Sequence, residues 1–179
     1  TPFAGSMSGL ISVNSGTATR GNSGFIQVSS GLAKGGRGGK ISITVGSGDS
    51  GGGNLILQAG TTSGNTGGRL QILSGYSSNL GSGDITLQTN LGGTSGVSGS
   101  IRLSSGETTS GNSGALNIGS GSATSGRGGS ILVTVGSGNS GTGGDVAIKG
   151  GQSSAASGGA VQISSGVGLS TSSGYVLIR

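Results

Sequence analysis

The sequence offers few side chains that could do chemistry. Its only carboxylates are Asp49, Asp84, Glu107 and Asp145, and it contains no histidine and no cysteine. Asp84 and Asp145 occupy the same position of a repeat but lie four repeats apart, which is about 19 Å if the repeats stack at the spacing of β-strands. Carboxylate pairs that cleave glycosidic bonds lie closer together, and no Ser-His or Cys-His nucleophile can form without histidine. We therefore expect a protein that is not an enzyme and binds no cofactor.

Glycine-rich segments superficially resemble ligand-binding loops. Gly35–Gly39 is followed by Lys40, but isoleucine stands where a phosphate-binding loop needs serine or threonine, and no helix is expected after it. Calcium-binding nonapeptide repeats need an aspartate in each turn, whereas Asp49 is replaced by Asn139 in the second copy of its segment. The sequence thus predicts neither a phosphate loop nor a metal site.

Nine basic and four acidic residues give a net charge of +5. Arg20, Lys34, Arg37 and Lys40 fall in neighbouring repeats and are candidates for a basic strip that attracts sulfated polysaccharide, silica or phosphate. The plainer interpretation, which we favour, is that these charges keep a nearly neutral chain soluble. No recognised nucleic-acid-binding motif accompanies them, and no run of about 18 apolar residues is present. Binding to nucleic acid and insertion into a membrane are therefore not expected.

The elements that would position these residues follow from a repeat of about fifteen residues. In each repeat two branched apolar residues stand one residue apart, an alternation that places both on one face of an extended strand. The twelve pairs are Ile11/Val13, Ile26/Val28, Ile41/Ile43, Leu55/Leu57, Leu70/Ile72, Ile85/Leu87, Ile101/Leu103, Leu116/Ile118, Ile131/Val133, Val146/Ile148, Val161/Ile163 and Val176/Ile178. So regular a period predicts one structural unit repeated along the chain.

Two columns of glycine flank the pairs. One glycine stands two residues before every pair. After each pair but the last comes a small residue and then a second glycine, which Asn90 replaces in one repeat. The second glycine is interpreted as a corner with left-handed or otherwise strained backbone, so that Gly121→Val should destabilise the fold strongly. The corner residues are Gly16, Gly31, Gly46, Gly60, Gly75, Asn90, Gly106, Gly121, Gly136, Gly151 and Gly166.

These patterns predict an all-β protein, a parallel β-solenoid (β-helix) of about twelve coils without helices. Branched aliphatic residues would fill one side of each coil, with Ala, Gly, Ser and Thr on the other. The 46 glycines disfavour a helix. A flexible Gly/Ser-rich linker is the main competing interpretation, but linkers lack phased apolar pairs. A glycine-rich polyproline bundle would need a three-residue glycine period.

A longer repeat is superimposed on the short one. Ile41–Gly51 reappears with few changes as Ile131–Gly141, and the segment Gly36–Gly39 returns as Gly126–Gly129. We expect two six-coil blocks, about 9–96 and 97–179, that form one continuous domain over residues 1–179.

The last strand of this solenoid would end at Arg179 without a cap. Open strand edges invite pairing, so we expect self-association end to end or continuation in a longer chain. The predicted function is a structural rod in an extracellular filament, sheath or adhesin stalk. The alternative is a solenoid that binds ice, mineral or polysaccharide. Its evidence is threonine pairs such as Thr17/Thr19, which do not form an unbroken column.

The segment Ser120–Val133 reads Ser-Gly-x-Ala-Thr-Ser-Gly-x-Gly-Gly-x-Ile-x-Val. This phrasing resembles the Gly/Ser/Thr-rich tandem repeats of large surface or secreted proteins of diatoms and related algae, and the likeness extends over essentially the whole chain. The resemblance implies an extracellular or cell-surface location and a structural or adhesive role. It implies no site residues.

Overall fold

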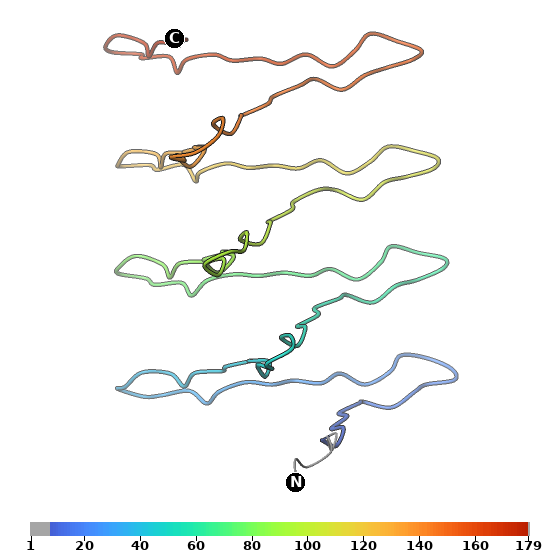
Figure 1. Ribbon diagram of the computed structural model, residues 1–179. Coiled ribbons are helices and arrows are strands. Elements are labelled where there is room, and N and C mark those ends of the chain that lie inside the picture. The colour runs from blue at the N-terminus through green and yellow to red at the C-terminus, as the bar shows by residue number, and fades with distance from the viewer. Residues whose placement is uncertain (1–7, 179) are drawn as a thin grey trace. The chain divides into compact units, whose positions relative to one another are not determined.

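The computed structural model describes residues 8–178, and it contains neither a helix nor a β-strand among them. The chain runs as extended coil segments joined by bends (Figure 1). The prediction of an all-β parallel β-solenoid is therefore wrong, and so is its description as a β-helix. Within the described residues no helix is long and apolar enough to cross a membrane. The predicted open edge at Arg179 lies outside the part of the chain that the structure describes.

The hydrogen bonds show why no solenoid forms. A solenoid needs ladder bonds between residues about fifteen apart, one coil from the next. The backbone hydrogen bonds found between described residues instead join partners three, seven or eight residues apart, as in Gly68 N–H to Gly60 O (2.8 Å) and Gly159 N–H to Gly151 O (2.9 Å). Each bond lies inside one repeat, so it cannot hold one repeat against another.

Composition supplies the physical reason. Glycine loses more conformational freedom on ordering than any other residue, and 46 of the 179 residues are glycine. Each full repeat offers only two to four large aliphatic side chains to offset the ordering of about fifteen residues. The regular spacing of the pairs was the basis of the solenoid prediction, but their number per repeat is too small to drive the stacking.

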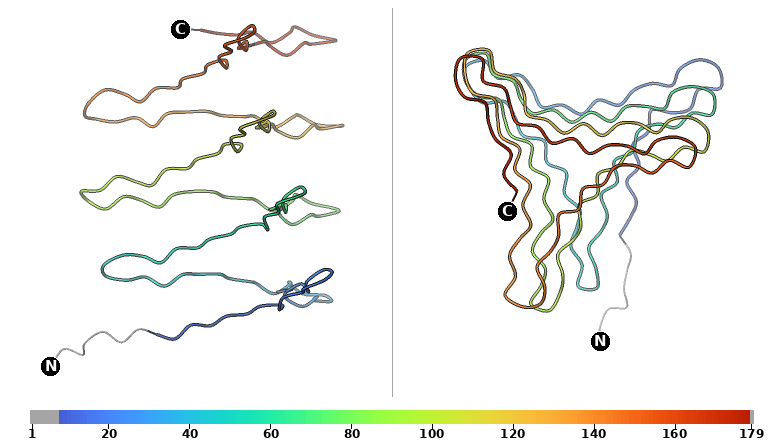
Figure 2. Two further views of the ribbon diagram at one scale, coloured as in Figure 1. Left: turned by 90° about the vertical axis from the view of Figure 1, so that its right-hand side faces the viewer. Right: turned by 90° about the horizontal axis from the view of Figure 1, so that it is seen from above.

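The repeats form closed loops instead. In each loop the small residue that follows an apolar pair contacts the glycine that precedes the next pair, so the chain leaves and returns to the same place (Figure 2). In ten loops a Cβ atom on that glycine would lie 2.5 to 3.7 Å from the small residue's side chain. In the remaining loop Gly150 approaches the carbonyl of Gly159. The closed loops span 15–24, 30–39, 45–53, 59–68, 74–83, 89–99, 105–114, 120–129, 135–144, 150–159 and 165–174.

Variation in repeat length falls inside the closed loops. The 14-residue repeat contains the shortest loop, 45–53, whose hydrogen bond joins Gly53 N–H to Gly46 O (3.4 Å). The 16-residue repeat contains the longest, 89–99, which accommodates its extra residue in a tight turn closed by Gly96 N–H to Gly93 O (3.1 Å). The extended segments between loops keep a constant length.

The chain divides into two compact units, Thr1–Leu87 and Gln88–Arg179. The first contains the closed loops from 15–24 to 74–83, and the second contains those from 89–99 to 165–174. The duplication predicted from sequence placed its boundary at about residue 96. The continuity of the two blocks in a single rod stays a prediction.

Neither unit has a core among its described residues, where no side chain is buried. The accessible surface of the chain is 18339 Å². A compact globule of 16.6 kDa would expose about 7,600 Å² and a fully unfolded chain about 24,000 Å². The structure therefore lies much nearer to the unfolded limit.

Candidate functional site

At the base of some closed loops the chain is packed so tightly that the residue two positions before the next pair must be glycine. At Gly39, Gly53 and Gly144 a Cβ atom would lie 2.9 Å from Ser30 Cβ, 2.5 Å from Val45 Cγ1 and 2.7 Å from Val135 Cγ1, respectively. Real side chains avoid such distances, so glycine allows the two ends of a loop to meet. This column is visible in the sequence, but its contact with the small residue eight to ten positions earlier was not predicted from it.

The predicted corner column behaves differently. Gly16 has the left-handed backbone expected there (φ 84°). None of the other described corner residues has a positive φ, and Asn90 does not either. A Cβ atom on any of the corner glycines would meet no heavy atom within 4 Å. Neither strain nor crowding therefore demands glycine at Gly121, which corrects the expectation for Gly121→Val.

Hydroxyl side chains stabilise the bends at the loop tips. Ser77 Oγ accepts hydrogen bonds from the backbone N–H groups of Asn79 (3.4 Å) and Leu80 (3.0 Å). Ser153 Oγ does the same for Ala155 (3.4 Å) and Ala156 (2.9 Å). Such serine-centred turns are a common alternative to regular secondary structure. They account for part of the serine content of the chain.

Only small residues of the loops are partly shielded from solvent. Among the described residues, intermediate exposure is confined to Ala59, Ser74, Ser77, Thr89 and Gly168. Three of these are the small residues at loop bases, and the other two lie within loops. The closed loops are thus the most enclosed parts of the chain, but they leave no pocket that could hold a ligand in the described part of the structure.

The aliphatic pairs form the most regular exposed feature. Their exposed fractions run from 47 % at Val176 to 90 % at Ile11. From Ile26 onward the first residue of each pair keeps a nearly constant exposure, as at Leu55 (55 %) and Leu116 (54 %). Such repetition shows that the pairs share one local environment, half open to solvent.

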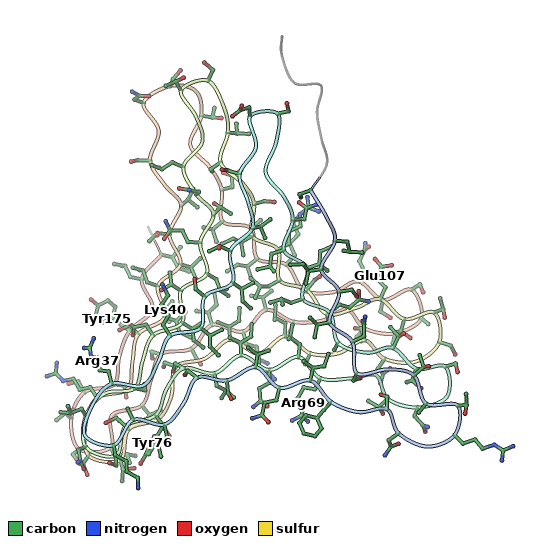
Figure 3. The ribbon with its side chains drawn as sticks, turned by 90° about the horizontal axis from the view of Figure 1, so that it is seen from below. Arg37, Lys40, Arg69, Tyr76, Glu107 and Tyr175 are labelled. Carbon is green, nitrogen blue, oxygen red and sulfur yellow. The ribbon has the colours of Figure 1, made fainter. Side chains whose placement is uncertain are left out.

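The basic residues named from sequence are all exposed. Lys34 and Arg37 lie in the closed loop 30–39, and Lys40 follows it directly. Figure 3 shows Arg37 and Lys40 extending away from the ribbon. Arg20 belongs to the preceding loop, 15–24, beside the left-handed Gly21 (φ 92°). Three of the four thus lie within residues 34–40, a grouping that the sequence itself shows.

The four acidic side chains all lie at the surface. Asp49, Asp84, Glu107 and Asp145 are exposed. The described residues contain no group of three or more acidic, histidine or cysteine side chains that could hold a metal ion. The predictions of no enzymatic activity and no cofactor stay predictions.

Comparison with known proteins does not assign the chain to a family. The chain matches no protein-family model, no curated protein and no solved structure. The resemblance to algal tandem-repeat surface proteins therefore rests on the repeat phrasing at Ser120–Val133 alone.

Proposed function

We propose that the chain is a structural, non-catalytic repeat protein that acts by associating with further copies of itself, as in a filament, sheath or stalk. One observation carries the proposal: twelve aliphatic pairs at a nearly constant period, exposed throughout the described residues. Soluble monomers rarely leave so much apolar surface in contact with water.

The amount of surface supports association. The chain exposes roughly 10,700 Å² more than a compact protein of its mass. A stable interface between two proteins needs about 1,200–2,000 Å² of buried surface. Several such interfaces could therefore form along one chain, and association would supply the burial that a single copy lacks.

The period favours a second copy as the partner. A chain with the same fifteen-residue spacing can place each of its pairs opposite a pair of its neighbour, in any register that differs by whole repeats. A partner without this period could match only a few pairs at once. The repeat thus provides self-complementarity without specific charges, which the 7 % content of charged residues would hardly supply.

The test is sedimentation velocity over a wide range of concentrations. Wild type should form larger species as concentration rises. The double variant I101S/L103S removes one pair, with exposed fractions of 53 % and 62 %, and should weaken association by roughly thirtyfold, because about 2 kcal/mol of apolar burial is lost. The matched control L91S/V97S removes two aliphatic residues that lie outside the pairs, are more than 90 % exposed, and should leave association unchanged.

Two outcomes would contradict the proposal. Wild-type monomers at every concentration would exclude self-association, and equal weakening by both double variants would indicate indiscriminate aggregation. Electron microscopy of the associated material then separates long fibres, which a structural polymer requires, from small discrete oligomers.

A surface-binding function on ice, mineral or polysaccharide was the alternative from sequence. Ice binding depends on a flat face of aligned threonines, and the described residues form no sheet that would provide one. No observation favours it over self-association.

A further inference from the structure

The segment 34–40 has a charge pattern that occurs once in the chain. It reads Lys-Gly-Gly-Arg-Gly-Gly-Lys, with a cation at every third residue and only glycine between them. Extended chain would separate successive cations by about 10 Å, and the bend at 34–36 brings the first two closer. No acidic residue lies between Arg20 and Lys40, so nothing nearby in the sequence neutralises the three charges.

The local backbone leaves this segment open to a ligand. Gly35 has a left-handed conformation (φ 82°), and a Cβ atom at Gly35, Gly36 or Gly38 would meet no heavy atom within 4 Å. Backbone N–H groups in such turns can point together toward an anion. Because Arg37 is flanked by glycines, no side chain of an adjacent residue covers its guanidinium group.

A hydrogen bond closes the base of this loop. The Ser30 hydroxyl donates to the carbonyl oxygen of Gly39 (3.0 Å), directly before Lys40. The loop that carries Lys34 and Arg37 is therefore tied beside Lys40. This arrangement limits how far the three cations can spread apart.

We propose that residues 34–40 bind the sulfate groups of an acidic polysaccharide. Regularly spaced cations can pair with the regularly spaced anionic groups of such a polymer. The arginine side chain and free backbone N–H groups can donate hydrogen bonds to the oxygens of a sulfate group. Nucleic acid fits less well, because the closed loop 30–39 and Lys40 contain no aromatic residue on which a base could stack. This binding is independent of the proposed self-association, since it uses none of the aliphatic pairs.

The chain contains its own control segment. Thr124–Ser130 reads Thr-Ser-Gly-Arg-Gly-Gly-Ser, with the arginine and three of the four glycines kept but both lysines absent. Ser125 stands in place of the left-handed Gly35 and has no positive φ. The loop base is again closed, with Ser120 Cβ 3.4 Å from the Cβ position of Gly129. The second copy thus keeps a closed loop and its arginine but lacks both the lysines and the left-handed glycine.

The experiment measures binding of the full chain to dextran sulfate by calorimetry at several salt concentrations. The variant K34T/K40S gives segment 34–40 the uncharged end residues of segment 124–130. Raising the salt concentration from about 50 to about 200 mM weakens the binding of a polyanion. Because K34T/K40S lacks two ion contacts, its affinity should fall about 12-fold less over this range than that of the wild type. The variant R102S/K149T removes the same charge elsewhere and should behave like wild type. The reverse variant, T124K/S130K, should add a second binding segment and raise the stoichiometry.

Three outcomes would overturn the assignment. Equal effects of K34T/K40S and R102S/K149T would show that net charge alone attracts the polymer. Equal binding of unsulfated dextran would exclude the sulfate groups as the recognised feature. Tighter binding of single-stranded DNA than of dextran sulfate would identify nucleic acid as the preferred ligand. Sedimentation of each variant without polysaccharide shows that self-association is unchanged, so that failure here leaves the proposed function standing.

Discussion

At the scale of the residue, glycine has two different roles in this chain. Glycines before the apolar pairs permit a close contact, as at Gly39 against Ser30. Glycines after the pairs meet nothing within 4 Å, and of these Gly16 has a positive φ. The two columns look equivalent in the sequence, because the residue type alone does not show which structural constraint requires glycine. Only the backbone geometry distinguishes an open position from a crowded one.

Substitution by valine should therefore give different results at two corner positions. Gly16→Val places a β-branched residue in a left-handed conformation, at a local cost of about 1–2 kcal/mol, and should shift the backbone conformation of residues 15–24. Gly121→Val should leave residues 120–129 unchanged. Backbone chemical shifts measured by NMR check both, and a large change around Gly121 together with none around Gly16 would reverse the assignment.

At the scale of the element, each closed loop is held by contacts within its own repeat. Sequence analysis predicted the period, the two glycine columns and the small residues between them, all of which recur in the loops. It failed where it assumed that identical repeats stack. Alternating apolar residues such as Ile131 and Val133 indicate an extended segment. They do not indicate which neighbouring segment would form the backbone hydrogen bonds that make it a β-strand. The contact that forms is local, between residues such as Ser120 and Gly129 of the same loop.

The loop 150–159 allows a test of closure with adjacent positions. A Cβ atom on Gly150 would collide with the carbonyl group of Gly159, whereas one on Gly151 would meet nothing within 4 Å. Gly150→Ala should open the loop and break the hydrogen bond from Gly159 N–H to Gly151 O (2.9 Å). Exchange of the Gly159 amide proton should accelerate roughly fivefold, as expected for loss of about 1 kcal/mol. Gly151→Ala is the control, and equal acceleration in both variants would argue against the closed loop.

At the scale of the whole molecule, the absence of buried side chains in the described residues determines the thermal behaviour. Globular proteins of 179 residues unfold with an enthalpy of about 125 kcal/mol, because heating disrupts a packed core. Differential scanning calorimetry of the dilute chain should show no cooperative transition. A sharp transition under conditions where sedimentation finds only monomers would contradict the structure.

The candidate site could be predicted from sequence only in part. Lys34, Arg37 and Lys40 were named as basic residues of a strip, together with Arg20. Lys34, Arg37 and Lys40 lie close together in the sequence, but the closure of loop 30–39 at Ser30 and Gly39, directly before Lys40, could not be predicted from composition or charge. The aliphatic pairs were predicted as an interior and are exposed, because a pattern specifies which residues share a face but not whether anything covers that face.

Because every closed loop is completed within one repeat, the number of repeats is free to change over evolutionary time. Recombination between similar repeats can delete or duplicate whole units, and each remaining loop would still close between its own small residue and glycine. The 14- and 16-residue repeats show that even a single-codon gain or loss is tolerated, since loops 45–53 and 89–99 accommodate it. Selection could thus adjust the length of such a protein in small steps without redesigning any part of it.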